Sequence, residues 1–242
     1  MRRSRPTALS ATAVALALMV GCSADGGAGP SPTGTSSSAP STAEPNSPPG
    51  SPSASGSPSP GASDVIPSSA LLRPEDLGGA KLEPLPAGDN AHLRPARPCG
   101  TPYPGDATRV AAVAMRAYVS PAANETPRVV LQYVGLHPGH ADSAFAEIVA
   151  AVRRCPGSLD PGKHRWEAAG TGPAGDESLL LRVSARFDYG GDEAVTTTPA
   201  VVARVGDHVT VVADLGWENA SGDESFVRNL TAKAVERLRS AA

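Results

Sequence analysis

The stretch that decides the fold is Val201-Val-Ala-Arg-Val-Gly-Asp-His-Val-Thr-Val-Val-Ala-Asp-Leu215, which contains two strands and the turn between them. Apolar residues alternate on both sides of the turn: Val201, Ala203, Val205, Val209, Val211, Ala213 and Leu215. This period of two is typical of a sheet with one covered face. Gly206-Asp207 joins the two runs, and a leading glycine favours a type II′ hairpin turn. The stretch therefore predicts a β-hairpin.

The segments outside this hairpin show either the same period or that of a helix. Alternating apolar residues predict strands at residues 113–119, 129–133 and 179–187. The helical period of three and four residues appears after Asp142 and again after Ser221. The apolar stripes of these two helices are Phe145, Ile148, Val149 and Val152 in the first, and Val227, Leu230, Ala234 and Leu238 in the second.

Local signals mark the ends of the helices. Ser221 and Glu224 have the spacing of a capping box, so we expect the last helix to begin there. Pro156-Gly157 follows the other long helix and predicts its end. A shorter helix is expected at Pro74 to Leu77, because proline suits the first helical position and two glycines follow.

The predicted order is a short helix, two strands, a helix, at least three strands and a last helix. Short connections between strands and few helices are typical of the α+β class. We therefore expect an antiparallel β-sheet with helices packed mainly on one face. Arg182 and Arg186 lie on the polar side of their strand, which indicates that the opposite face is at least partly in contact with water.

The N-terminal residues have the pattern of a bacterial lipoprotein signal. Three arginines precede an apolar segment, residues 8–20, which is shorter than a membrane span of ~20 residues. Met19-Val20-Gly21-Cys22 resembles the lipobox, in which a small residue precedes the cysteine that receives the lipid. We expect residues 1–21 to be removed and Cys22 to carry the lipid, palmitate included. The alternative is an ordinary secreted protein whose Cys22 is discarded with its signal.

Residues 22–65 have the composition of a stalk. They consist mainly of Ser, Pro, Gly, Thr and Ala, and such a segment buries too little apolar surface to offset its chain entropy. We expect a disordered linker that holds the domain at residues 66–242 away from the membrane. Such a stalk is either a bare spacer or a carrier of O-linked sugars.

Two cysteines remain in the expected domain, Cys99 and Cys155. An even pair in an exported chain favours a disulfide. A loop of this length is worth ~4 kcal/mol in the chain-entropy model. The alternative is two unrelated thiols.

The charge balance excludes some partners. The chain has 21 Lys and Arg, and the loss of the three arginines at its N-terminus leaves 18 against 24 Asp and Glu, a formal net charge of −6. An acidic chain without a basic stripe does not fit nucleic acid as a partner. The expected partners are the membrane, through the N-terminal lipid, and an envelope ligand or protein.

A search for catalytic motifs finds none: there is no Gly-x-Ser-x-Gly, His-Glu-x-x-His, phosphate loop or Cys-x-x-Cys. We therefore expect no catalytic residues, no cofactor and no metal. His137 and His140 flank Pro-Gly, and we favour a turn over a metal site. Asp188 to Glu193 forms an acidic segment that we expect to be a solvated turn and not a calcium site.

Two further residue pairs have both a functional and a structural interpretation. Asp176 and Glu177 would suit acid–base chemistry, although a turn with solvated charges is the simpler interpretation. Trp166 and Trp217 would stack on a sugar or an aromatic ligand, but as two of few aromatics they are expected in the core or at its rim.

Four segments form a recognisable set: Leu71-Leu-Arg-Pro-Glu-Asp-Leu77, the helix that ends in Cys155, Gly175-Asp-Glu-Ser178, and Arg204-Val-Gly-Asp207 before Val209. Together they resemble the PknH-like extracellular sensor domain of actinobacteria. The resemblance covers about residues 67–242. It implies an α+β domain with a cleft that binds an unknown envelope ligand without catalysis. Kinase ectodomains of this family usually have two disulfides, whereas this domain has cysteines for one.

The sequence as a whole predicts a non-catalytic sensor or ligand-binding lipoprotein on the extracellular face of the cell membrane. Two other functions remain open. One is an envelope enzyme that acts on cell-wall material through carboxylates such as Asp176 and Glu177. The other is a protein-interaction or inhibitory lipoprotein that uses the wet face of the sheet.

Overall fold

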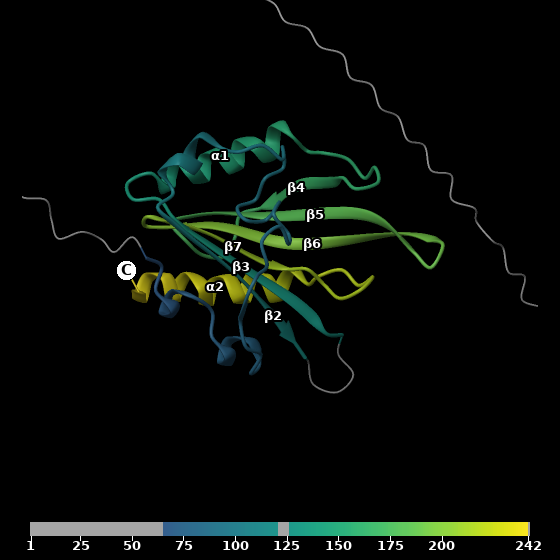
Figure 1. The fold of residues 1–242 in the computed structure, drawn as a ribbon, viewed down its shortest axis with the longest axis horizontal. Helices are drawn as coiled ribbons and strands as arrows, with labels where there is room; N and C mark the ends of the chain where they lie inside the picture. Colours follow the sequence, from purple (N-terminus) through teal and green to yellow (C-terminus); the bar gives the residue numbers. More distant parts are fainter. Residues whose placement is uncertain (1–64, 121–125, 242) are drawn as a thin grey trace, which may run out of the picture. The chain divides into compact units, whose positions relative to one another are not determined.

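A computed structural model describes residues 65–120 and 126–241, which belong to one compact unit (Figure 1). Its strands are β1 (Glu83–Pro84), β2 (Ala111–Val119), β3 (Arg128–Leu136), β4 (His164–Gly170), β5 (Glu177–Tyr189), β6 (Asp192–Val205) and β7 (His208–Asp214). Its α-helices are α1 (Ala141–Arg154) and α2 (Glu224–Ala241), and its 3₁₀ helices are η1 (Ser68–Ala70), η2 (Pro74–Leu77) and η3 (Pro104–Thr108). Residues 1–21, Cys22 and the stalk up to residue 64 lie outside the described residues.

The strands form one seven-stranded sheet in the order β1-β2-β3-β7-β6-β5-β4. Every neighbouring pair is antiparallel. The hairpin of β6 and β7 turns at Gly206-Asp207, and Val205 pairs with His208 across that turn. The predicted α+β fold with an antiparallel sheet is therefore confirmed, and the short helix predicted at Pro74 to Leu77 is η2.

The two α-helices lie on opposite faces of the sheet, with α1 above it and α2 below it in Figure 1. Phe145 and Ile148 of α1 pack in the same apolar cluster as Val211. Leu230 of α2 packs in another cluster, with Val212 of the same strand. Because neighbouring residues of a strand face opposite sides, these clusters lie on different faces. The expectation that the helices share one face is wrong in this respect.

The central strands explain why both faces are covered. Val201, Val202 and Ala203 of β6 are consecutive and fully buried, so this strand is apolar on both sides. A continuous apolar run is typical of a strand that is buried on both faces. Water reaches the sheet beyond the start of α2, where the side chains of Arg182 and Arg186 are 44% and 38% exposed. The prediction of a partly wet surface is thus confirmed for the outer strands only.

The start of α2 differs from the predicted capping box. The helix begins at Glu224, and Asp223 Oδ1 accepts a hydrogen bond of 3.0 Å from the backbone N–H of Phe226. Ser221 lies before the helix, where its Oγ accepts from the backbone N–H of Thr197 at 2.9 Å. Asp223 is the better cap because its carboxylate also interacts favourably with the helix dipole.

The edges of the sheet are irregular. The edge strand β1 has only two residues and ends in Pro84. The other edge strand, β4, has a register shift between Ala168 and Gly170. Beyond the end of β7, the loop before α2 covers β6, because Gly222 N–H donates to the carbonyl of Thr197 at 3.0 Å.

None of the helices in residues 65–120 and 126–241 is long and apolar enough to cross a membrane.

Candidate functional site

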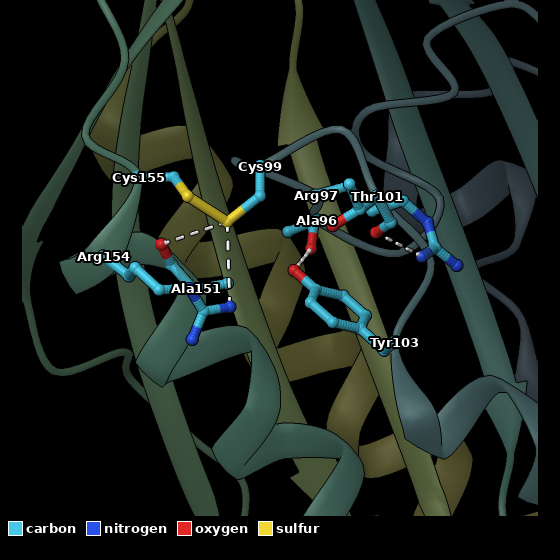
Figure 2. The surroundings of a disulfide bond; sticks show 8 residues. All are labelled: Ala96, Arg97, Cys99, Thr101, Tyr103, Ala151, Arg154 and Cys155. Atoms are coloured by element: carbon cyan, nitrogen blue, oxygen red, sulfur yellow. Dashed lines mark hydrogen bonds between the residues drawn. A yellow bond between two sulfur atoms is a disulfide. The ribbon is translucent and has the colours of Figure 1, made fainter.

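The disulfide between Cys99 and Cys155 is formed, with a Cα–Cα distance of 5.3 Å, and this prediction is confirmed (Figure 2). It joins a proline-rich segment to the residue that follows α1. Cys155 N–H also donates to the carbonyl of Ala151 at 2.8 Å, which holds the cysteine against the last helical turn. Arg154 lies beside the bond, with Nη2 at 3.8 Å from Cys99 Sγ. The proline-rich segment is therefore held on the face of the sheet that α1 covers.

Tyr103 and Arg97 give this irregular segment a fixed shape. Figure 2 shows the Tyr103 hydroxyl pointing at the carbonyl of Ala96, to which it donates at 2.7 Å. Arg97 Nη1 donates to the carbonyl of Thr101 at 3.1 Å, and its guanidinium lies 5.0 Å from the centre of the Tyr103 ring. Burial raises the pKa of Tyr103 to about 12, so the hydroxyl stays protonated and keeps donating.

Asp106 of η3 connects Arg97 to the sheet. Its carboxylate accepts from Arg97 at 2.7 Å, from Arg109 at 2.6 Å and from the backbone N–H of Tyr103 at 2.8 Å. Burial alone would raise the pKa of Asp106, but these hydrogen bonds outweigh it and the pKa is lowered. The single negative charge of Asp106 lies between the positive charges of Arg97 and Arg109, so it neutralises only one of the two.

An open cleft of about 290 Å³ lies beside the disulfide. We call it the disulfide cleft, and its lining residues are His92, Arg97, Pro98, Cys99, Gly100, Gly157, Ser158, Gly162, Lys163, His164 and Trp166. One wall comes from the proline-rich segment before η3, and the other from the end of α1 through to β4. Its volume is near the lower end of the range for small-molecule pockets.

Three aromatic rings join the two walls of the cleft, His92 from one wall and His164 and Trp166 from the other. His92 and His164 stack with their ring centres 4.1 Å apart, and Trp166 makes an edge-to-face contact with His92, with their ring centres 6.0 Å apart. Burial, and next the neighbouring His164, lower the pKa of His92 to about 4. Burial lowers the pKa of His164 as well. Both imidazoles are therefore neutral at pH 7, and each carries one N–H group.

The stacked histidines predict a loss of stability in mild acid. The unfolded chain binds a proton at His92 near pH 6.5 and the folded chain only near pH 4, so protons favour unfolding between these values. We expect the free energy of unfolding to fall as the pH drops from 6.5 to 4, by on the order of 2 kcal/mol for His92. Urea titrations across this range should show a weaker pH dependence for His92→Phe than for the wild type.

The exposed His140 supplies the control for this prediction. His140→Phe replaces a histidine that lies outside the cleft, and it should leave the pH dependence of wild-type stability in place. An equal flattening of the curve by both variants would contradict the assignment to His92.

A second cleft, of about 300 Å³, lies before α2 and is a weaker candidate. Its arginine, Arg128, is already paired with the fully buried Asp214 at 2.8 Å. Its lining includes Thr126, the first described residue after the gap at 121–125.

The carboxylates considered for acid–base chemistry make ion pairs outside the cleft. Glu177 Oε2 lies 2.7 Å from Arg204 Nε, and Asp176 Oδ2 accepts from the backbone N–H of Gly206 at 2.8 Å. The hydrogen bond from Gly206 lowers the pKa of Asp176, which is the wrong direction for a proton donor at neutral pH. Through these contacts the two carboxylates join the start of β5 to the end of β6, which is a structural role.

The remaining candidates from the sequence occupy structural positions. His137 is buried and forms a turn with His140 before α1, as predicted. The predicted turn between β5 and β6 is present at Gly190-Gly191, but residues 188, 189, 192 and 193 extend the paired strands, and Gly191 N–H donates to Asp188 Oδ1 at 3.0 Å. Trp217 packs edge-on against Tyr118, away from the disulfide cleft. In the described part of the chain, no group of three or more His, Cys, Asp or Glu side chains could hold a metal ion.

Sequence reasoning identified Cys99, Cys155 and Trp166 but missed the rest of the cleft. His92 and His164 are distant in sequence, and neither lies in a periodic segment. Lys163 looks like an ordinary surface lysine. One signal was available in the sequence: His92 lies close to Cys99, and Lys163–His164 lie close to Cys155. A disulfide between the two cysteines must bring these two segments together.

Comparison of the chain with protein-family models finds no match, and no curated protein is significantly similar to it.

Proposed function

We infer that this protein is a lipid-anchored lipoprotein on the extracellular face of the cell membrane, and that its domain is a non-catalytic sensor or ligand-binding module. The disulfide cleft is the proposed binding site. The observation that carries this proposal is the lining of the cleft: a stacked pair of imidazoles, two cationic residues and three exposed glycines. A concave site with a few converging polar groups is typical of ligand binding.

Two further arguments support the proposal. The described domain has a rigid sheet behind the cleft and a disulfide in its wall, so the site is largely formed before a ligand arrives. The resemblance to PknH-like sensor domains, which we propose as the family of residues 67–242, implies the same kind of non-catalytic role.

Native mass spectrometry of the full chain purified from its own cell envelope tests the binding function. We expect a fraction of the protein to carry a small-molecule adduct. Ser158→Trp, which fills the cleft, should abolish the adduct. Ser240→Trp, on the exposed end of α2, is the matched control and should retain it. Absence of any adduct in the wild type, or its persistence in Ser158→Trp, would count against the cleft as a binding site.

The anchor is tested separately by Cys22→Ser. Without the sulfur the lipid has no attachment point, so we expect the protein to move from the membrane fraction to the medium. A mature N-terminus with two or more acyl chains binds stably, because each buried methylene contributes ~0.8 kcal/mol. Ser37→Ala, in the stalk, should stay with the membrane. Membrane retention of Cys22→Ser would refute the lipobox interpretation.

A protein-interaction lipoprotein is the second candidate, and one feature favours it. The β5–β6 hairpin extends past both neighbouring strands, because β4 pairs with β5 only up to Ala185 and β7 pairs with β6 only from Ala200. Tyr189 and Val195 near its tip are 48% and 47% exposed. A protein partner, in place of a small-molecule adduct, in the native mass spectra would support this function.

A further inference from the structure

We propose that the disulfide cleft takes a small anionic ligand, one that carries a carboxylate or a phosphate group. Lys163 would hold the anion, and the N–H groups of His92 and His164 would donate to it. This inference rests on the proposed binding function and adds the chemical class of the ligand.

The charges of the cleft lining are the first argument. Its lining includes Arg97 and Lys163 and no carboxylate. Because Arg97 Nη2 already donates to both oxygens of Asp106 at 2.7 Å, Lys163 is the cation that is left for a ligand. Lys163 is exposed and makes no ion pair within residues 65–120 and 126–241. An ammonium group without a partner retains its full capacity for a charge-assisted hydrogen bond.

Neighbouring carboxylates do not cancel this charge. Asp106 is shared between Arg97 and Arg109, so the three groups together remain cationic. Asp160 Oδ2 accepts from Ser158 Oγ at 2.7 Å, and Asp160 is not part of the lining. Arg154 adds a further cation beside the disulfide.

The contrast with the rest of the chain is the second argument. The chain has more acidic than basic residues, 24 against 21, so its surface does not attract anions in general. A local cationic cleft on such a chain directs an anion to one place. The neutral stacked rings of His92 and His164 add apolar surface and hydrogen-bond donors, which fits a ligand whose anionic group is attached to a short apolar or planar part.

Isothermal titration calorimetry of the full mature chain in detergent, with inorganic phosphate and with succinate as separate probes, tests the proposal. We expect saturable binding of at least one probe. Lys163→Gln should weaken that binding by about tenfold or more, since it removes a charge-assisted hydrogen bond. Lys81→Gln removes an exposed lysine outside the cleft and should leave the affinity unchanged.

Binding of phosphate alone would identify the phosphate group as the recognised chemistry, and binding of succinate alone would identify the carboxylate. Absence of saturable binding for both probes would overturn the proposal, and so would an equal loss in Lys81→Gln and Lys163→Gln. The binding function itself would survive that result if native mass spectra still contained a neutral adduct that Ser158→Trp removes. Loss of both the probes and the adduct would refute the two proposals together.

Discussion

The double variant Cys99→Ser/Cys155→Ser is expected to lose ~4 kcal/mol of its free energy of unfolding, because the bond closes a loop with a sequence separation of 56 residues. The effect arises mainly in the unfolded chain, which regains the conformations that the bond excludes. The folded domain is affected too, since the bond holds the proline-rich wall of the cleft against the end of α1. We therefore expect loss of ligand binding together with the loss of stability.

Urea denaturation measures the first effect, and Cys22→Ser is the matched control because it removes the one cysteine outside the disulfide. That control should unfold at the wild-type urea concentration. A decrease below ~1 kcal/mol in the double variant would contradict the loop-entropy estimate.

Asp214→Ala is expected to lower the free energy of unfolding by ~3–5 kcal/mol. The Asp214 side chain is fully buried at the end of β7. Its carboxylate accepts from Arg128 at 2.8 Å, and from the backbone N–H groups of Gly216 and Asp223 at 2.9 Å each. Truncation leaves all three donors without this partner, and the partly buried guanidinium keeps only the more distant carboxylate of Asp223 at 3.7 Å.

Urea denaturation also measures this effect, and Asp176→Ala provides the comparison. Asp176 pairs with Arg204 at 3.3 Å, but its side chain is 37% exposed. Water replaces such contacts easily, so we expect a decrease of no more than ~1 kcal/mol. Equal losses in the two variants would contradict the structural role assigned to the buried carboxylate.

Local patterns in the sequence were enough to predict most elements but not how the layers are arranged. β2 and β5 carry polar side chains such as Arg116 and Arg182 between their apolar ones, and alternation predicts such strands well. In the run Val201-Val202-Ala203, the alternating pattern takes account of Val201 and Ala203 only. Val202 between them is apolar as well, and this unbroken run was the signal that the second face of the sheet is also covered, by α2.

Edge elements were missed for a related reason. In β4 only Trp166 is fully buried, so the strand has no repeating apolar position to detect. β1 has two residues and depends on pairing with Arg116 and Met115 of β2. Long-range pairing, which a local pattern does not encode, determines both strands.

The disulfide was predictable, whereas the cleft around it was not. Parity and export context were sufficient to pair Cys99 with Cys155. The stacking of His92 on His164 depends on how two irregular segments meet, and irregular segments have no periodicity from which contacts can be inferred. The sequence therefore predicted the disulfide that links the two walls of the cleft, whereas the side chains that line the space between the walls are known only from the folded structure.

The irregular edges of the sheet have a consequence for a protein that is anchored to a membrane surface, as we propose for this one. Open strand edges of neighbouring molecules tend to pair and to grow into fibrous aggregates. Pro84 lacks the N–H that such pairing needs, and the register shift near Gly170 twists the other edge away from a straight partner. Neighbouring copies would therefore remain separate and keep their clefts accessible.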